Sequence, residues 1–103
     1  MGRRRMTVYT SDDSGVLLIL KNETDKSIDA DFACVSSPEI TDVCVYVENR
    51  KGEKTLQDRV FVRESHSWWT RAGGKLLPPH GLRPGETLVV TTNGRAALRI
   101  DWN

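Results

Sequence analysis

The chain has 103 residues, of which 38% are hydrophobic and 28% charged, and this size and composition fit one globular domain. Its 15 basic and 14 acidic residues leave a net charge of +1, which argues against a dedicated nucleic-acid-binding protein, because such proteins carry a marked basic excess. The longest apolar run, residues 16–20, is strand-sized and falls short of the roughly 18 residues that a membrane span needs.

Consecutive arginines, Arg3 to Arg5, stand near the start of the chain. We expect residues 1–5 to be a flexible basic terminus before a domain that covers residues 6–103. The alternative is a tether to an acidic membrane or a nucleic acid. Polar residues rather than an apolar stretch follow the arginines, so we expect no secretory signal and an intracellular protein, with the cytoplasm as the default. Cys34 and Cys44 fit that reducing compartment as free thiols.

Apolar and polar residues alternate along most of the chain, which predicts short β-strands throughout. We expect strands within residues 6–9, 16–21, 27–35, 43–48, 55–63, 87–91 and 96–102. The nearly continuous apolar run at 16–21 predicts a strand that is covered on both faces. Asn49 to Gly52 predicts a hairpin turn, and Asn93-Gly94 is the strongest hairpin signal in the chain.

The alternation also predicts which residues share a face. In the third segment one face holds Ile28, Ala30, Phe32 and Cys34, and the other holds Asp29 and Asp31. In the fourth, Val43, Val45 and Val47 share a face opposite Cys44, Tyr46 and Glu48. In the last, the inward residues are Ala96, Leu98, Ile100 and Trp102. Turn signals recur about every ten residues, which is typical of a sandwich or a barrel, and we predict an all-β fold, a single antiparallel β-sandwich of seven or eight strands.

No constellation of residues predicts catalysis. The candidate metal ligands Cys34, Cys44, His66 and His80 lack the close spacing of a zinc site. No serine or cysteine stands in a recognisable nucleophile motif. We therefore expect a protein that is not an enzyme and that binds neither a metal nor a cofactor.

The segment from residue 64 to 84 predicts a long loop, with a short extended piece near residues 75–77, because it is rich in Gly and Pro. It carries Trp68 and Trp69 side by side, and adjacent residues of an extended segment point opposite ways. Exposed tryptophan beside Arg and His is the composition of an interface hot spot. The alternative is that both rings cap an open end of the sandwich. Our candidate partner-binding residues are His66, Trp68, Trp69, Arg71, His80 and Arg83.

One resemblance covers about half of the chain. Its residues are 20–28, Phe32, 36–37, 42–47, 51–54, the strand approach 82–87, and Trp102. In this pattern the chain resembles the BsuPI-like intracellular proteinase inhibitors, which implies an immunoglobulin-like β-sandwich that binds a protease. The tryptophan-rich hairpin of that family is replaced here by Thr55-Leu56-Gln57.

A second resemblance rests on Asn22-Glu23-Thr24 with Phe32, and on residues 84–87 followed by Asn93-Gly94. In these residues the chain is similar to the small calpain-related β-sandwich domains of kinetoplastid protozoa, which implies a non-catalytic regulatory domain. We expect a binding module, acting as an inhibitor or adaptor of another protein or through self-association. The alternative is a peripheral membrane or calpain-related domain that uses exposed tryptophan and the N-terminal arginines. We expect no binding to nucleic acid.

Overall fold

A computed structural model describes residues 5–11, 14–36, 41–62 and 76–102, and the side chains of residues 5, 6, 32–36 and 60–62 are not described. Within these ranges the chain forms seven β-strands and no helix. The strands are β1 (Arg5–Thr10), β2 (Val16–Lys21), β3 (Ala30–Ser36), β4 (Thr41–Glu48), β5 (Lys54–Val62), β6 (Thr87–Thr92) and β7 (Ala97–Trp102).

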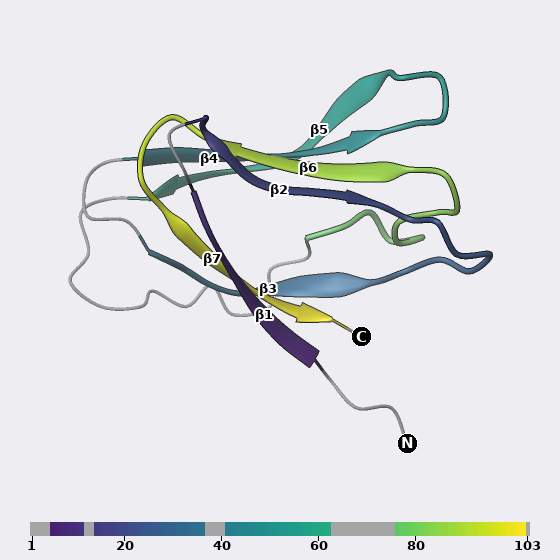
Figure 1. Ribbon diagram of the computed structural model, residues 1–103, viewed down its shortest axis with the longest axis horizontal. Helices are drawn as coiled ribbons and strands as arrows, with labels where there is room; N and C mark the ends of the chain where they lie inside the picture. The colour runs from purple at the N-terminus through teal and green to yellow at the C-terminus, as the bar shows by residue number, and fades with distance from the viewer. Residues whose placement is uncertain (1–4, 12–13, 37–40, 63–75, 103) are drawn as a thin grey trace.

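The strands form two antiparallel sheets that pack face to face. One sheet has three strands in the order β1-β7-β3, and the other has four in the order β2-β6-β4-β5. Figure 1 shows them as two layers, with the turn before β6 at one end of the four-stranded sheet. The predicted β-sandwich is thus confirmed, with the lower of the two expected strand numbers.

The strand order differs from the ABED and CFG sheets of an immunoglobulin constant domain, so the immunoglobulin-like character is not confirmed. The pairs are nested instead: β1 with β7, β2 with β6, and β4 with β5. A further contact falls between the second and third of these pairs in the nested order. Residues 76–82 lie beside the stretch that leads into β3, through a bridge from Ile28 to Leu82. This nested pairing is the winding of a jelly roll whose sixth strand is reduced to a bridge.

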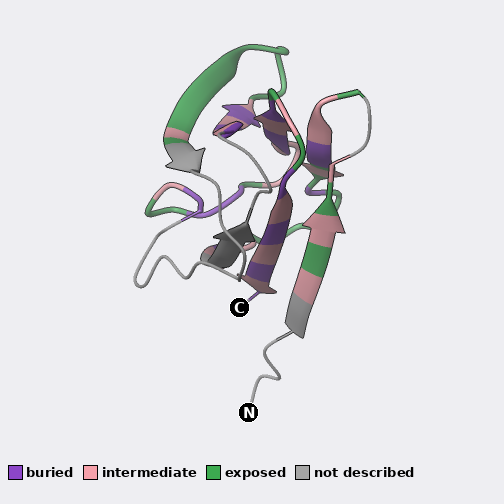
Figure 2. Ribbon diagram, turned by 90° about the vertical axis from the view of Figure 1, so that its left-hand side faces the viewer, coloured by how far each residue is buried: buried purple, intermediate pink, exposed green. Residues whose placement is uncertain are grey.

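The hydrophobic core lies between the two sheets. Its members come from both layers and from the segment before β6: Leu17, Leu18, Ala30, Val43, Val45, Val47, Leu76, Leu77, Leu82, Leu88, Val90, Ala96, Leu98, Ile100 and Trp102. In Figure 2 the buried positions alternate along the strands of both sheets, whereas the edge strand β5 is exposed along much of its length. The predicted inward faces of β4 and β7 are confirmed, since their alternate residues are buried.

The strand β2 corrects one expectation. Its register shifts between Val16 and Leu18, which lets Leu17 and Leu18 both be buried. Ile19, however, is 64% exposed, and β2 is an edge strand of its sheet. The prediction that this strand is covered on both faces was therefore wrong.

The Asn93-Gly94 turn corrects a second expectation. A two-residue hairpin would pair β6 with β7, yet these strands belong to different sheets. The hairpin turn of this sequence needs positive φ at both central residues, and neither Asn93 nor Gly94 has it. The chain here crosses from one sheet to the other. The Asn93 side chain instead accepts a hydrogen bond from the Asp42 N–H at 2.8 Å and so fixes the start of β4.

Three smaller differences complete the comparison. The first strand begins at Arg5, inside the segment expected to be a flexible terminus. A register shift between Phe32 and Cys34 interrupts the regular backbone pairing of β3 with β7. Leu76 and Leu77 lie in a bend and are buried in the core, rather than forming the expected extended piece.

Candidate functional site

The structure describes two of the six predicted partner-binding residues, His80 and Arg83. Both are exposed, and both lie in residues 76–86, the segment that leads into β6. The remaining four lie outside the described residues: His66, Trp68, Trp69 and Arg71. The geometry of the predicted site can therefore be built from the His80 and Arg83 side alone.

Buried residues hold this segment against the sandwich. Leu82 is fully buried and exchanges two backbone hydrogen bonds with Ile28, at 2.9 and 2.7 Å. Gly81, between His80 and Leu82, has φ of 75°, and a Cβ there would lie 2.6 Å from the Ile28 carbonyl oxygen. Only glycine fits so close an approach with positive φ. His80 and Arg83 thus project from a segment with a fixed path.

Asn22 ties this segment to the turn after β2. Its side chain is buried, and its Nδ2 donates to the carbonyl oxygens of Lys26 at 2.8 Å and Leu82 at 2.7 Å. Its Oδ1 accepts from the Thr24 N–H and hydroxyl, at 3.0 and 2.6 Å. Its backbone N–H also donates to the Glu86 carbonyl at 2.8 Å. Although Asn22-Glu23-Thr24 matches a glycosylation acceptor, both amide protons are used inside the fold.

Arg50 brings in the third loop, the turn between β4 and β5. Its Nε and Nη2 both donate to the Pro84 carbonyl oxygen, at 3.1 and 3.0 Å. The side chain passes so close to Gly85 that a Cβ on this glycine would lie 2.5 Å from Arg50 Nε. The predicted turn at residues 49–52 is confirmed, with Gly52 at φ of 85°. Residues 22–28, 49–53 and 78–86 are called the loop end below.

An open cleft lies at the loop end, with a volume of about 550 Å³. It is lined by Ser27, Asn49, Arg50, Lys51, Glu53, Arg83, Pro84 and Glu86. A second depression, of about 490 Å³, shares Arg50 and Pro84 with it and extends toward Lys21. Arg50 and Pro84 therefore form a ridge between two concave surfaces.

The charged groups of the cleft differ in how they are engaged. Glu86 accepts a hydrogen bond from the Arg83 N–H at 2.7 Å, and Glu53 accepts one from Asn49 Nδ2 at 3.3 Å. Among the described residues, neither the Lys51 ammonium nor the Arg83 guanidinium has an ion-pair partner, and Arg50 uses its donors on a neutral carbonyl. The cleft therefore presents three cationic heads and two carboxylates.

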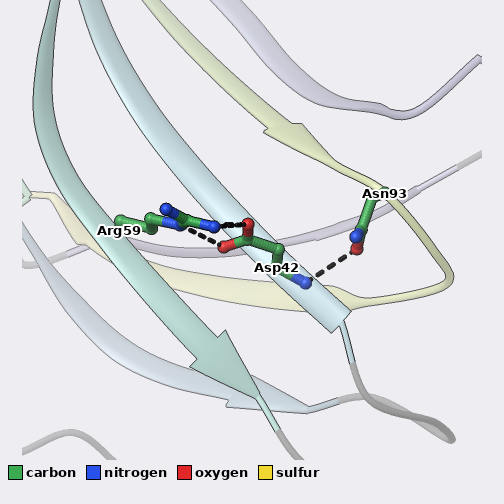
Figure 3. A network of polar contacts seen from close by, with 3 residues as sticks. All are labelled: Asp42, Arg59 and Asn93. Atoms are coloured by element: carbon green, nitrogen blue, oxygen red, sulfur yellow. Dashed lines mark hydrogen bonds and ion pairs between the residues drawn. The ribbon is translucent and has the colours of Figure 1, made fainter.

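The opposite end of the four-stranded sheet, residues 14–15, 41–42 and 92–96, holds an exposed ion pair. Arg59 Nε donates to both carboxylate oxygens of Asp42, at 2.9 and 3.0 Å, beside the Asn93 contact (Figure 3). Hydrogen bonding from Arg59 holds the pKa of Asp42 below its ordinary value, and the same bond raises the pKa of Arg59. A surface ion pair between β4 and β5 therefore holds this end of the sheet together.

Other chemistry is limited within the described part of the chain. Cys44 is a free cysteine, and interaction with its thiol raises the pKa of Tyr46. The described ranges contain no group of three or more His, Cys, Asp or Glu that could hold a metal ion. They also contain no helix with the length and hydrophobicity of a membrane span.

Comparison of the chain with models of known protein families, with curated proteins and with solved structures found no match. The resemblances to proteinase inhibitors and to calpain-related domains therefore stay predictions.

Sequence reasoning did not single out Arg50, Lys51 or the buried Asn22 as parts of a site. Arg50 and Lys51 appeared only as turn residues, and their nearness to Pro84 depends on a contact across 34 positions. The available signal was the sequence Pro84-Gly85-Glu86, which marked a tight turn but not what lies across it.

Proposed function

We propose that this domain is a non-catalytic binding module that engages a partner protein through the cleft at the loop end. The observation that carries the proposal is the set of three cationic side chains, Arg50, Lys51 and Arg83, around an open cleft. The predicted contacts of His66, Trp68, Trp69 and Arg71 belong to the same proposal. The inhibitor resemblance implies a protease as the partner, and the alternative is the target of an adaptor.

The loop end suits recognition because its backbone is ordered before any partner arrives. Asn22 joins two of its loops, and Arg50 joins the third through the Pro84 carbonyl. A site that is preorganised avoids part of the entropy cost of binding. Arginine is enriched at interfaces because its guanidinium forms several hydrogen bonds at once. The cleft is thus a stable platform with charged groups at its rim.

The chemistry of the lining favours binding over catalysis. Arginine and lysine stay protonated near neutral pH, so they suit ion pairing and hydrogen bonding rather than proton transfer. The cleft is open rather than enclosed, which fits a segment of a protein better than a small molecule that must be buried on most sides. Carboxylates of a partner would form ion pairs with Lys51 and Arg83 at the lowest cost in free energy, because these two cations have no existing ion pair to break within the described residues.

The test is affinity capture with charge-reversed variants. The double variant Lys51→Glu/Arg83→Glu reverses the two cleft cations whose side chains are not bound to Pro84. The control Lys26→Glu/Lys54→Glu makes the same charge change at exposed sites outside the lining of the cleft. We expect the first variant to bind the captured partner at least about tenfold more weakly, equivalent to about 1.4 kcal/mol, and the second to bind it like the original chain.

Two outcomes would overturn the proposal. One is a partner that both double variants bind equally well. The other is the absence of any protein partner combined with salt-sensitive binding to vesicles of phosphatidylserine, which would support the membrane-surface alternative instead.

A further inference from the structure

The strand β2 leaves one side of its backbone open. It is the first strand in the order β2-β6-β4-β5, and within the described residues no other strand borders it on its outer side. Two hydrogen bonds fix which residues face that side. The Asn22 N–H donates to the Glu86 carbonyl, and on the other flank of β6 the Asn93 N–H donates to the Asp42 carbonyl.

These bonds set the alternation of the antiparallel ladder, in which bonded and non-bonded pairs take turns. Counting back from Asn22 along the register, Leu20 with Leu88 is a bonded pair, and Ile19 with Val89 is not. The N–H and C=O groups of Ile19 therefore point to the open side of the sheet, and those of Lys21 do so by the same count.

The open edge is apolar where it is unpaired. Residues 17–20 of β2 carry no charge, and the Ile19 side chain is 64% exposed. The other edge strand of this sheet, β5, carries Lys54, Asp58 and Arg59, the kind of charges that keep edges from pairing. Of the two edges, β2 has the weaker protection against a further strand.

Ile19 also ends an apolar row that crosses the outer face of the sheet. The register places Ile19 beside Val89, Val89 beside Tyr46, and Tyr46 beside Leu56. Ile19 and Leu56 are two of the three exposed large hydrophobic residues described for the chain. The sequence pattern of β2 is that of a strand covered on both faces, and within one chain only one face is covered.

We propose that β2 pairs with β2 of a second copy of this chain, antiparallel and about a two-fold axis at Ile19. The two four-stranded sheets then join into one sheet of eight strands. The Ile19 N–H of each copy donates to the Ile19 C=O of the other, and the two apolar rows become continuous.

A second copy is the occupant that fits because this edge complements itself. With Ile19 opposite Ile19, Leu18 faces Leu20 of the other copy, so no charges are opposed in the paired segment. The register shift between Val16 and Leu18 limits the regular pairing to residues 18–20 of each copy. The contact is smaller than the roughly 800 Å² per partner of a standard interface, so we expect a weak dimer with a dissociation constant of order 100 µM.

The test is sedimentation equilibrium of the protein without any ligand, at concentrations up to about 1 mM, where such a dimer is populated. It compares two matched lysine variants with the original chain. Ile19→Lys places a charge on the β2 edge, and Leu56→Lys places the same charge on the β5 edge at the other end of the same row. We expect the original chain and Leu56→Lys to dimerise, and Ile19→Lys to stay monomeric. Ile19→Pro, which removes the outward N–H, should also be monomeric.

Each other outcome overturns the proposal. An original chain that is monomeric at this concentration contradicts it directly. Loss of the dimer in both lysine variants would indicate face-to-face packing through the apolar row, and loss in Leu56→Lys alone would indicate pairing through β5. A monomer that binds an extended peptide along β2 would make the occupant a different protein. The dimer and the partner-binding cleft rest on different residues, so either can fail alone.

Discussion

The two ends of the four-stranded sheet are held by different kinds of polar contact. At the loop end, the neutral side chain of Asn22 is 1% exposed and makes four hydrogen bonds. At the opposite end, the charged pair of Asp42 and Arg59 is at the surface, and the Arg59 side chain is 63% exposed. Buried groups lose more when a partner is removed than exposed charges do, because water cannot replace the partner. The neutral end should therefore be the one on which stability depends.

The largest expected effect is that of Asn22→Ala. It removes four hydrogen bonds at a buried site and leaves the Thr24 N–H without its partner, while the Lys26 and Leu82 carbonyls keep the Thr24 hydroxyl and the Ile28 N–H. We expect a loss of about 2–4 kcal/mol in the free energy of unfolding. Urea unfolding measures it. The control is Asn93→Ala at the opposite end, where one exposed bond to Asp42 is lost and about 0.5–1.5 kcal/mol is expected. Equal losses would contradict the comparison.

The next effect compares a glycine at each end. Gly15 has φ of 80°, and a Cβ there would lie 2.8 Å from the Thr92 carbonyl oxygen, which is backbone and cannot move aside. Gly85 has φ of 85°, but its close neighbour is the flexible Arg50 side chain. We expect Gly15→Ala to cost about 2–3 kcal/mol and Gly85→Ala about 1–2 kcal/mol, measured by thermal and urea unfolding.

A double-mutant cycle separates the two parts of the Gly85 cost. In an Arg50→Ala background the crowding at Gly85 is gone and only the positive φ remains, so the cost of Gly85→Ala should be smaller there. If that cost is unchanged by the loss of Arg50, the side chain already moves freely and does not hold the loop end together.

The smallest effect is that of Asp42→Asn. Because the folded state lowers the pKa of Asp42 below its ordinary value of 3.8, the ion pair adds stability above that value, and this is lost as the pH falls through the lowered pKa. We expect Asp42→Asn to be slightly less stable than the original chain near pH 7, with a difference that disappears as the pH falls through the lowered pKa and that is smaller at high salt. A difference that persists in acid would mean that the carboxylate charge is not responsible.

The strands could be predicted because their signal is local. Alternate burial in β4 and β7 follows from the period of two, and Gly52 and Gly85 stand where the turns need positive φ. The Asn93-Gly94 hairpin failed for the same reason, since local turn chemistry does not tell whether the next strand joins the same sheet. Burial of β2 was overestimated because an apolar residue, Ile19, stands on its outer face.

The candidate site could be predicted only in part. Arg83 was expected from its place beside the long loop, and the structure brings it to the cleft. Arg50 and Asn22 were not expected, because each acts through contacts far along the chain, across 34 positions to Pro84 and 60 positions to Leu82. Such contacts depend on the nested pairing of the strands, which the alternation of residues does not encode.

The position of β7 in the middle of its sheet has a consequence for folding. Its neighbours β1 and β3 lie on either side of it and do not pair with each other (Figure 1). The register pairs Arg5, at the start of β1, with Trp102, at the end of β7. On a ribosome, the three-stranded sheet cannot form until β7 has been synthesised. Until then, β1 and β3 have no strand between them to pair with. Since pairing of distant segments is slow, we expect the domain to complete its fold only once β7 has been synthesised, and to refold in milliseconds to seconds.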